Sequence, residues 1–91
     1  MSAPPLPRSG QAFMDAAREA GWTLTGRTGQ QSLSGDWYHE LEASHPDGGL
    51  RQVRLGYLAG RLRSVLLWQP TRAGWATGTL KAAHGYLAEE S

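Results

Sequence analysis

The spacing of apolar residues near the N-terminus predicts a helix. Small and aromatic side chains recur at helical intervals from Phe13 to Ala20, and Ser9 stands before them as a good N-cap. Gly21 supplies a stop signal directly after the last of these positions. The pattern therefore predicts a first helix over residues 10–20.

Period-two alternation after this helix predicts four strands. A short strand begins at Trp22 and ends near Arg27, and it is followed by a polar loop rich in Gly, Gln and Ser. Three longer runs at 36–45, 50–58 and 61–69 are separated by turn residues. Strands joined by such short connections form an antiparallel sheet.

The turn between the second and third strands predicts a register. The sequence His-Pro-Asp-Gly-Gly at 45–49 is typical of a three-residue hairpin loop with a bulge. That loop pairs Leu41 with Val53 and Glu40 with Arg54. A loop one residue longer would bury carboxylates without partners, so the pattern of apolar and charged residues favours the three-residue loop.

The turn at Ala59 and Gly60 predicts a two-residue hairpin, and regular alternation from there divides the sheet into two faces. Large apolar side chains are expected on the inner face, at Trp37, Leu41, Val53, Leu55, Tyr57, Leu62, Leu66 and Trp68. The outer face is expected to carry Tyr38, Glu40, Glu42, Gln52, Arg54, Arg61, Arg63, Val65 and Leu67.

Helical spacing returns in the last part of the chain and predicts a second helix over 72–88. Three glycines weaken this helix, so a start near Arg72 and a start near Thr77 both stay open. The expected fold class is α+β: a two-layer fold in which a four-stranded antiparallel sheet carries an N-terminal and a C-terminal helix on one face, in the order α-β-β-β-β-α.

The first eight residues predict a disordered, proline-rich leader, which leaves 9–91 as a single α+β domain. Pro4 and Pro7, followed by Arg8, also match a polyproline ligand of SH3-type domains. Four-residue matches of this kind are common by chance, so the leader is the simpler interpretation.

Composition narrows the class of protein. The 91 residues suffice for one domain, and 40% hydrophobic with 19% charged residues is typical of a globular chain. No apolar run is long enough to span a membrane, so a cytoplasmic protein without a membrane partner is expected. Cysteine is absent, which excludes disulfides and thiolate chemistry. The net charge of +1 gives no global attraction to nucleic acid.

The residues that resemble catalytic or metal-binding groups are better explained by structure. His39 and His45 lie six positions apart on one strand, too far to share one ion. Asp47 serves the hairpin turn, and Glu40 and Glu42 are expected to pair with neighbouring arginines. We therefore expect no metal, no cofactor and no enzymatic activity.

The outer face is the candidate binding surface, because aromatic residues and arginine are enriched at protein interfaces. The expected function is a small non-enzymatic protein-interaction module, an adaptor or inhibitor such as a phage or mobile element encodes. It would bind a protein partner, or itself as a homodimer, through the open sheet face and the last strand. The expected partner-binding residues are Tyr38, Arg54, Arg61, Arg63, Val65 and Leu67.

Two alternatives remain open. In the first, the arginines at 51, 54, 61 and 63 contact phosphates and Tyr38 or an exposed tryptophan stacks on a base, which makes the chain a nucleic-acid-binding domain. In the second, tryptophans line a small-molecule or enzymatic cleft between the first helix and the sheet. A merely solvated sheet face is also compatible with the sequence.

Overall fold

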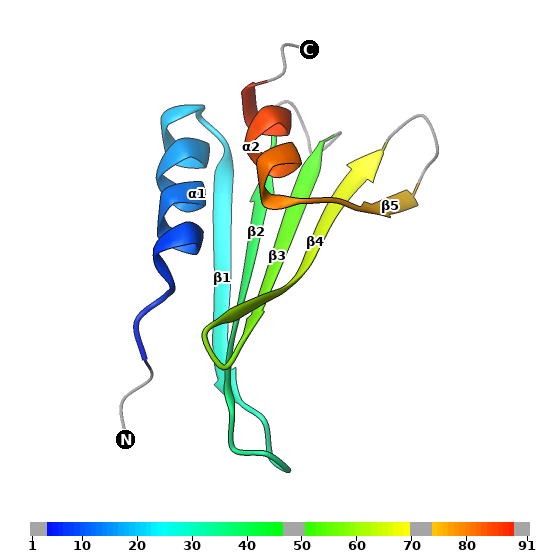
Figure 1. Cartoon of the computed structure of the whole chain (residues 1–91). Helices are drawn as coiled ribbons and strands as arrows, with labels where there is room; N and C mark the ends of the chain where they lie inside the picture. The colour runs from blue at the N-terminus through cyan, green and yellow to red at the C-terminus, as the bar shows by residue number, and fades with distance from the viewer. Residues whose placement is uncertain (1–3, 47–50, 70–73, 89–91) are drawn as a thin grey trace.

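A computed structural model of the chain shows two helices on one face of a five-stranded antiparallel sheet (Figure 1). The structure describes residues 4–46, 51–69 and 74–88. The elements are α1 (Arg8–Glu19), β1 (Thr23–Gln30), β2 (Trp37–Ser44), β3 (Gln52–Leu58), β4 (Arg61–Gln69), β5 (Gly74–Thr77) and α2 (Leu80–Ala88). Each strand pairs with the next one along the chain. The expected α+β fold with an antiparallel sheet is confirmed, with five strands instead of four.

Helix α1 begins two residues earlier than predicted. Its N-cap is Pro7, which makes no side-chain cap, and the expected cap Ser9 lies inside the first turn. The Ser9 hydroxyl instead shares a hydrogen bond of 2.7 Å with the Tyr57 hydroxyl on β3. Arg8 therefore belongs to the helix rather than to the leader, and Leu6 packs against the core. Residues 1–3 of the expected leader lie outside the described residues.

The predicted register between β2 and β3 is wrong by two residues. Leu41 lies opposite Leu55 and Glu42 opposite Arg54. The physical reason is a longer connection, because the His45 amide donates to the Arg51 carbonyl at 2.9 Å, whereas the predicted turn pairs His45 with Gly49. The turn residues 47–49 lie outside the described residues. A two-residue slip keeps every side chain on its expected face.

A β-bulge between β3 and β4 overturns the predicted phase of β4. Leu58 pairs with Arg61 and Tyr57 with Leu62, as the two-residue turn predicts. The register then shifts, and Gly56 faces Ser64, so that Arg63 is the extra residue of β4. From Ser64 to Trp68 the side chains of β4 lie on the face opposite to the predicted one.

The segment before α2 is a strand, not the first turns of a helix. Strand β5 pairs with the end of β4, where Trp75 lies opposite Trp68 and Ala76 opposite Leu67. Helix α2 begins only at Leu80. Thr79 caps this helix, because its side-chain hydroxyl accepts a hydrogen bond from the Ala82 amide. Both predicted starting points of the second helix are therefore wrong, and Arg72 lies outside the described residues.

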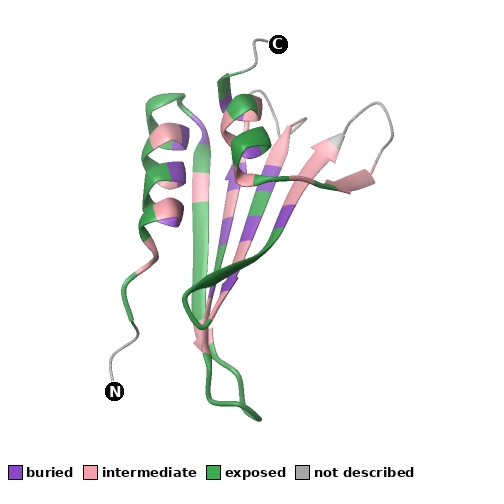
Figure 2. Ribbon diagram, viewed as in Figure 1, coloured by how far each residue is buried: buried purple, intermediate pink, exposed green. Residues whose placement is uncertain are grey.

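The core lies between the helices and the inner face of the sheet, where buried positions of α1 and α2 point toward the strands (Figure 2). Its fully buried members include Phe13 of α1 and Val53 and Leu55 of β3. Leu41 and Val53 are buried as expected. Neither of the two described helices has the length and apolar character needed to cross a membrane.

Candidate functional site

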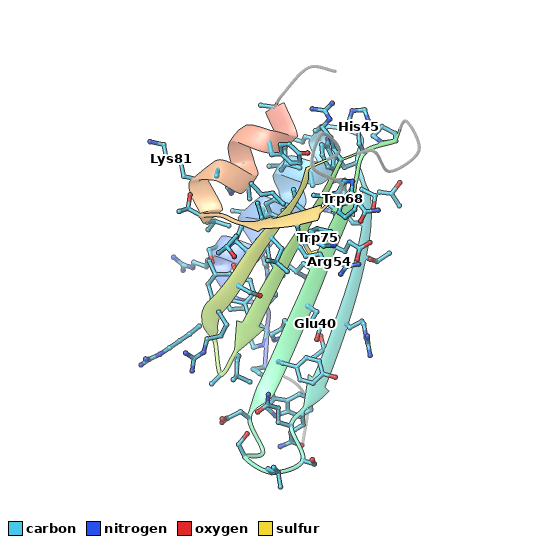
Figure 3. The ribbon with its side chains drawn as sticks, turned by 90° about the vertical axis from the view of Figure 1, so that its right-hand side faces the viewer. Glu40, His45, Arg54, Trp68, Trp75 and Lys81 are labelled. Atoms are coloured by element: carbon cyan, nitrogen blue, oxygen red, sulfur yellow. The ribbon has the colours of Figure 1, made fainter. Side chains whose placement is uncertain are left out.

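The outer face of the sheet, opposite the helices, is hollowed by a groove. The groove encloses about 780 Å³ and extends from β1 across β2 and β3 to β4. Figure 3 views this face, with Glu40 and Arg54 toward the reader and α1 behind the strands. Charged, aromatic and apolar side chains line it together, among them Arg27, Tyr38, Glu40, Arg54, Arg63 and Leu66.

Two glycines of the outer face, of which Gly56 lines the groove, leave room for a side chain of the neighbouring strand. A Cβ on Gly56 would lie 2.5 Å from the Ser64 hydroxyl oxygen, so the hydroxyl occupies the space that a side chain at this position would fill. A Cβ on Gly29 would lie 2.6 Å from Cζ of Tyr38, so the tyrosine ring covers the backbone of β1 there. The glycines thus let side chains from neighbouring strands lie close to the sheet.

A tryptophan–arginine cluster, which consists of Arg54, Trp68 and Trp75, adjoins the groove through Arg54, the member that lines it. The Arg54 guanidinium lies 4.4 Å from the centre of the Trp75 ring, and the two indoles meet edge to face at 5.5 Å. The Nε of Arg54 also donates to the Glu42 carboxylate at 2.9 Å. These contacts hold the guanidinium against an aromatic surface, while half of the Arg54 side chain remains exposed.

Three charged groups of the groove have no ionic partner within the described part of the chain. Glu40 and Arg27 are opposite each other on β2 and β1, and both are exposed, yet they form no ion pair. Arg63 of the bulge is likewise exposed and without an ionic partner among these residues. The groove therefore offers separate positive and negative groups to a ligand of mixed charge.

The structure brings three of the predicted site residues together. Tyr38, Arg54 and Arg63 all line the groove, on β2, β3 and β4 respectively. Arg61 is exposed where β4 begins, and it does not line the groove. Their roles in binding stay predictions, but their placement on one open face agrees with the sequence expectation.

The expectation that Val65 and Leu67 lie on the outer face is wrong. The bulge turns both side chains inward, where Val65 is only 4% exposed and Leu67 packs against the core. A Cβ on Gly78 would lie 3.1 Å from Leu67, so the chain after β5 passes close above this leucine. Neither side chain can contact a partner on the open face.

Arg51, one of the arginines in the nucleic-acid alternative, does not line the groove either. Its guanidinium lies 5.8 Å from the Trp22 ring centre and 6.0 Å from that of Tyr86. Trp22 is a buried member of the core, and Tyr86 belongs to α2. Arg51 thus stacks on aromatic rings at the helix side of the sheet.

Trp68 and Trp75 are not among the partner-binding residues that the sequence predicts, because its patterns place one in the core and the other beside a helix. Both are half-buried on the outer face in the structure. Two tryptophans that flank a short Pro- and Gly-containing segment are a signal for a cross-strand aromatic pair. The helical spacing of the residues after Trp75 masks that signal.

The three histidines lie apart, and within the described residues no group of three or more His, Cys, Asp or Glu side chains could hold a metal ion. His39 is buried and shares a hydrogen bond of 3.1 Å with Thr28. His45 packs edge to face on Trp22, and His84 packs on Phe13. Trp22 and Phe13 are both buried members of the core.

Comparisons with protein-family models, with curated proteins and with solved structures gave no match. The residues of the groove are therefore the only guide to its chemistry.

Proposed function

We propose that this protein is a non-enzymatic interaction module that binds a protein partner through the groove on its outer sheet face. The observation that carries the proposal is the tryptophan–arginine cluster, half-exposed beside an open groove that Arg54 lines. Aromatic and arginine side chains in such positions supply most of the binding energy in many protein interfaces. A cytoplasmic location belongs to the same proposal and rests on the sequence alone.

The charges favour a protein over a nucleic acid. Glu40 and Glu42 lie on the same face as the arginines, and a phosphate backbone would meet both carboxylates. A protein segment instead can present a cation to Glu40, an acid to Arg63 and an apolar side chain to Leu66. We therefore expect a partner with an apolar anchor between charges of opposite sign.

The test uses peptides selected from a displayed random library on the wild-type chain, followed by titration of a selected peptide. Arg63→Glu and Trp75→Ala should each weaken the peptide about tenfold or more, since each removes one recognition element of the outer face. Lys81→Glu is the matched control, because Lys81 is exposed on α2, away from the groove (Figure 3). Selected peptides that bind all three variants equally would overturn the proposal.

Labelled oligonucleotides separate the nucleic-acid alternative in the same assay. If the groove binds a protein partner, the chain should show no oligonucleotide binding whose affinity falls steeply as the salt concentration rises. Glu40→Lys removes the one groove carboxylate without an ionic partner among the described residues, so it would strengthen a phosphate site. Oligonucleotide binding that is salt-sensitive and tighter in Glu40→Lys would therefore replace the protein-partner proposal.

A further inference from the structure

Strand β1 is a long edge strand whose backbone is open to solvent. It ends the sheet order, and it pairs with β2 over eight residues without a register shift. The stretch 25–28 is exposed, and it includes Gly26, which has no side chain to cover its backbone. Natural edge strands are commonly protected by charged residues, proline or a bulge, and β1 has no proline, no bulge and a single charged residue, Arg27.

The direction of the free backbone groups follows from the hairpin. The Gln31 amide donates to the Asp36 carbonyl at 2.8 Å, so it points toward β2. Backbone groups alternate in direction along a strand, which turns those of Leu24, Gly26 and Thr28 away from β2. These residues present N–H and C=O groups at the outer edge of the sheet.

We infer that two copies of this chain pair through their β1 strands in antiparallel orientation, with Gly26 at the two-fold axis. In this register Gly26 faces Gly26 of the second copy, and Leu24 faces Thr28, so all outward backbone groups of the segment find partners. The two sheets become one continuous sheet. The half-buried Leu24 gains additional cover from the second copy.

Charge selects this register over its neighbour. A shift that pairs Gly26 with Thr28 of the second copy places the two Arg27 side chains directly opposite each other, which is unfavourable. With Gly26 at the axis, Arg27 lies beside Thr25 of the second copy. In that second copy, Thr25 pairs with Glu42 on β2. Arg27 makes no ion pair within its own described chain, so it is available to that acidic strand.

This pairing uses backbone groups at the edge of β1 and engages Arg27 at the β1 side of the groove. The groove residues Tyr38, Glu40, Arg54 and Arg63 lie on β2 to β4, so the pairing does not depend on the proposed function. The other edge strand, β5, has four residues and offers a shorter ladder. An edge-paired dimer would also place two grooves on the same side of one sheet. Such a dimer would present two binding surfaces to a bivalent partner.

Molar mass measured by light scattering over a range of concentrations tests the inference. The wild-type chain should approach twice the mass of one chain as concentration rises. Gly26→Ala keeps the outward N–H and should still dimerise, because its added Cβ meets nothing closer than 3.7 Å. Gly26→Pro removes that N–H and should raise the Kd on the order of tenfold to a hundredfold.

Circular dichroism checks that the Gly26→Pro variant is folded. If this variant does not fold, cross-linking through a single engineered cysteine gives a second test of the dimer. The natural chain has no cysteine, so Gly26→Cys should form a disulfide-linked dimer under mild oxidation, whereas Ser32→Cys in the exposed hairpin loop should not. A wild-type monomer at every concentration, or equal cross-linking of the two cysteine variants, would overturn the inference. Dimerisation lost in Trp75→Ala but kept in Gly26→Pro would also overturn it and assign the contact to the outer face.

Discussion

The bulge at Arg63 makes a sharp prediction about two adjacent residues of β4. Val65 is 4% exposed in the core, whereas Leu66 lies on the wall of the groove. Val65→Ala removes two buried methyl groups, each worth about 0.8 kcal/mol, and leaves a small cavity, so the expected loss is about 2 kcal/mol. Leu66→Ala removes more atoms, but from a half-exposed position, and should cost less than about 1 kcal/mol.

Chemical denaturation followed by tryptophan fluorescence measures both losses, and thermal unfolding supports them. A loss of about 2 kcal/mol in a chain of this size lowers the Tm by on the order of 10 °C. Aspartate at the same positions sharpens the contrast, because a buried carboxylate costs several kcal/mol against a total stability of roughly 5–14 kcal/mol. Val65→Asp should therefore unfold the chain, and Leu66→Asp should leave it folded.

The opposite order of losses would contradict the bulge. Regular alternation without a bulge places Leu66 in the core and Val65 on the surface. A larger loss for Leu66→Ala than for Val65→Ala would show that β4 keeps this regular phase. Equal losses would also contradict the structure, since one side chain is buried and the other is not.

Three further predictions concern contacts that the structure alone reveals. Gly56→Ala should lower the free energy of unfolding by about 1 kcal/mol, because the added Cβ would meet the Ser64 hydroxyl. Adding Ser64→Ala in a double-mutant cycle should restore the lost stability. Thr79→Ala should lower the free energy of unfolding by about 1 kcal/mol through loss of the α2 cap, and an unchanged Tm would contradict that role. Trp75→Ala should lower the free energy of unfolding by about 1–2 kcal/mol, because it removes the ring contacts with Arg54 and Trp68. Glu42→Gln should lower it by less than about 0.5 kcal/mol, because the ion pair of Glu42 with Arg54 is partly exposed. Equal losses for the two variants in urea titrations would contradict a stabilising role of the ring contacts.

The candidate site was only partly predictable. Tyr38 and Arg54 share the outer face because alternation along β2 and β3 fixes their direction whatever the loop length. The tryptophans were not predictable in the same way, because Trp75 could belong to a helix or a strand by its local spacing. Its pairing opposite Trp68 decides the matter, and that pairing is a contact between strands.

Periodicity within single elements is enough to predict the fold class, the first helix and the faces of β2 and β3. The phase of β4 depends instead on contacts between elements. The run from Ser64 to Trp68 has apolar residues in both phases, so alternation cannot choose between them. The bulge resolves this ambiguity by burying Val65 and Leu67 against the helices, and it thereby leaves Leu66 and Trp68 to form the open face.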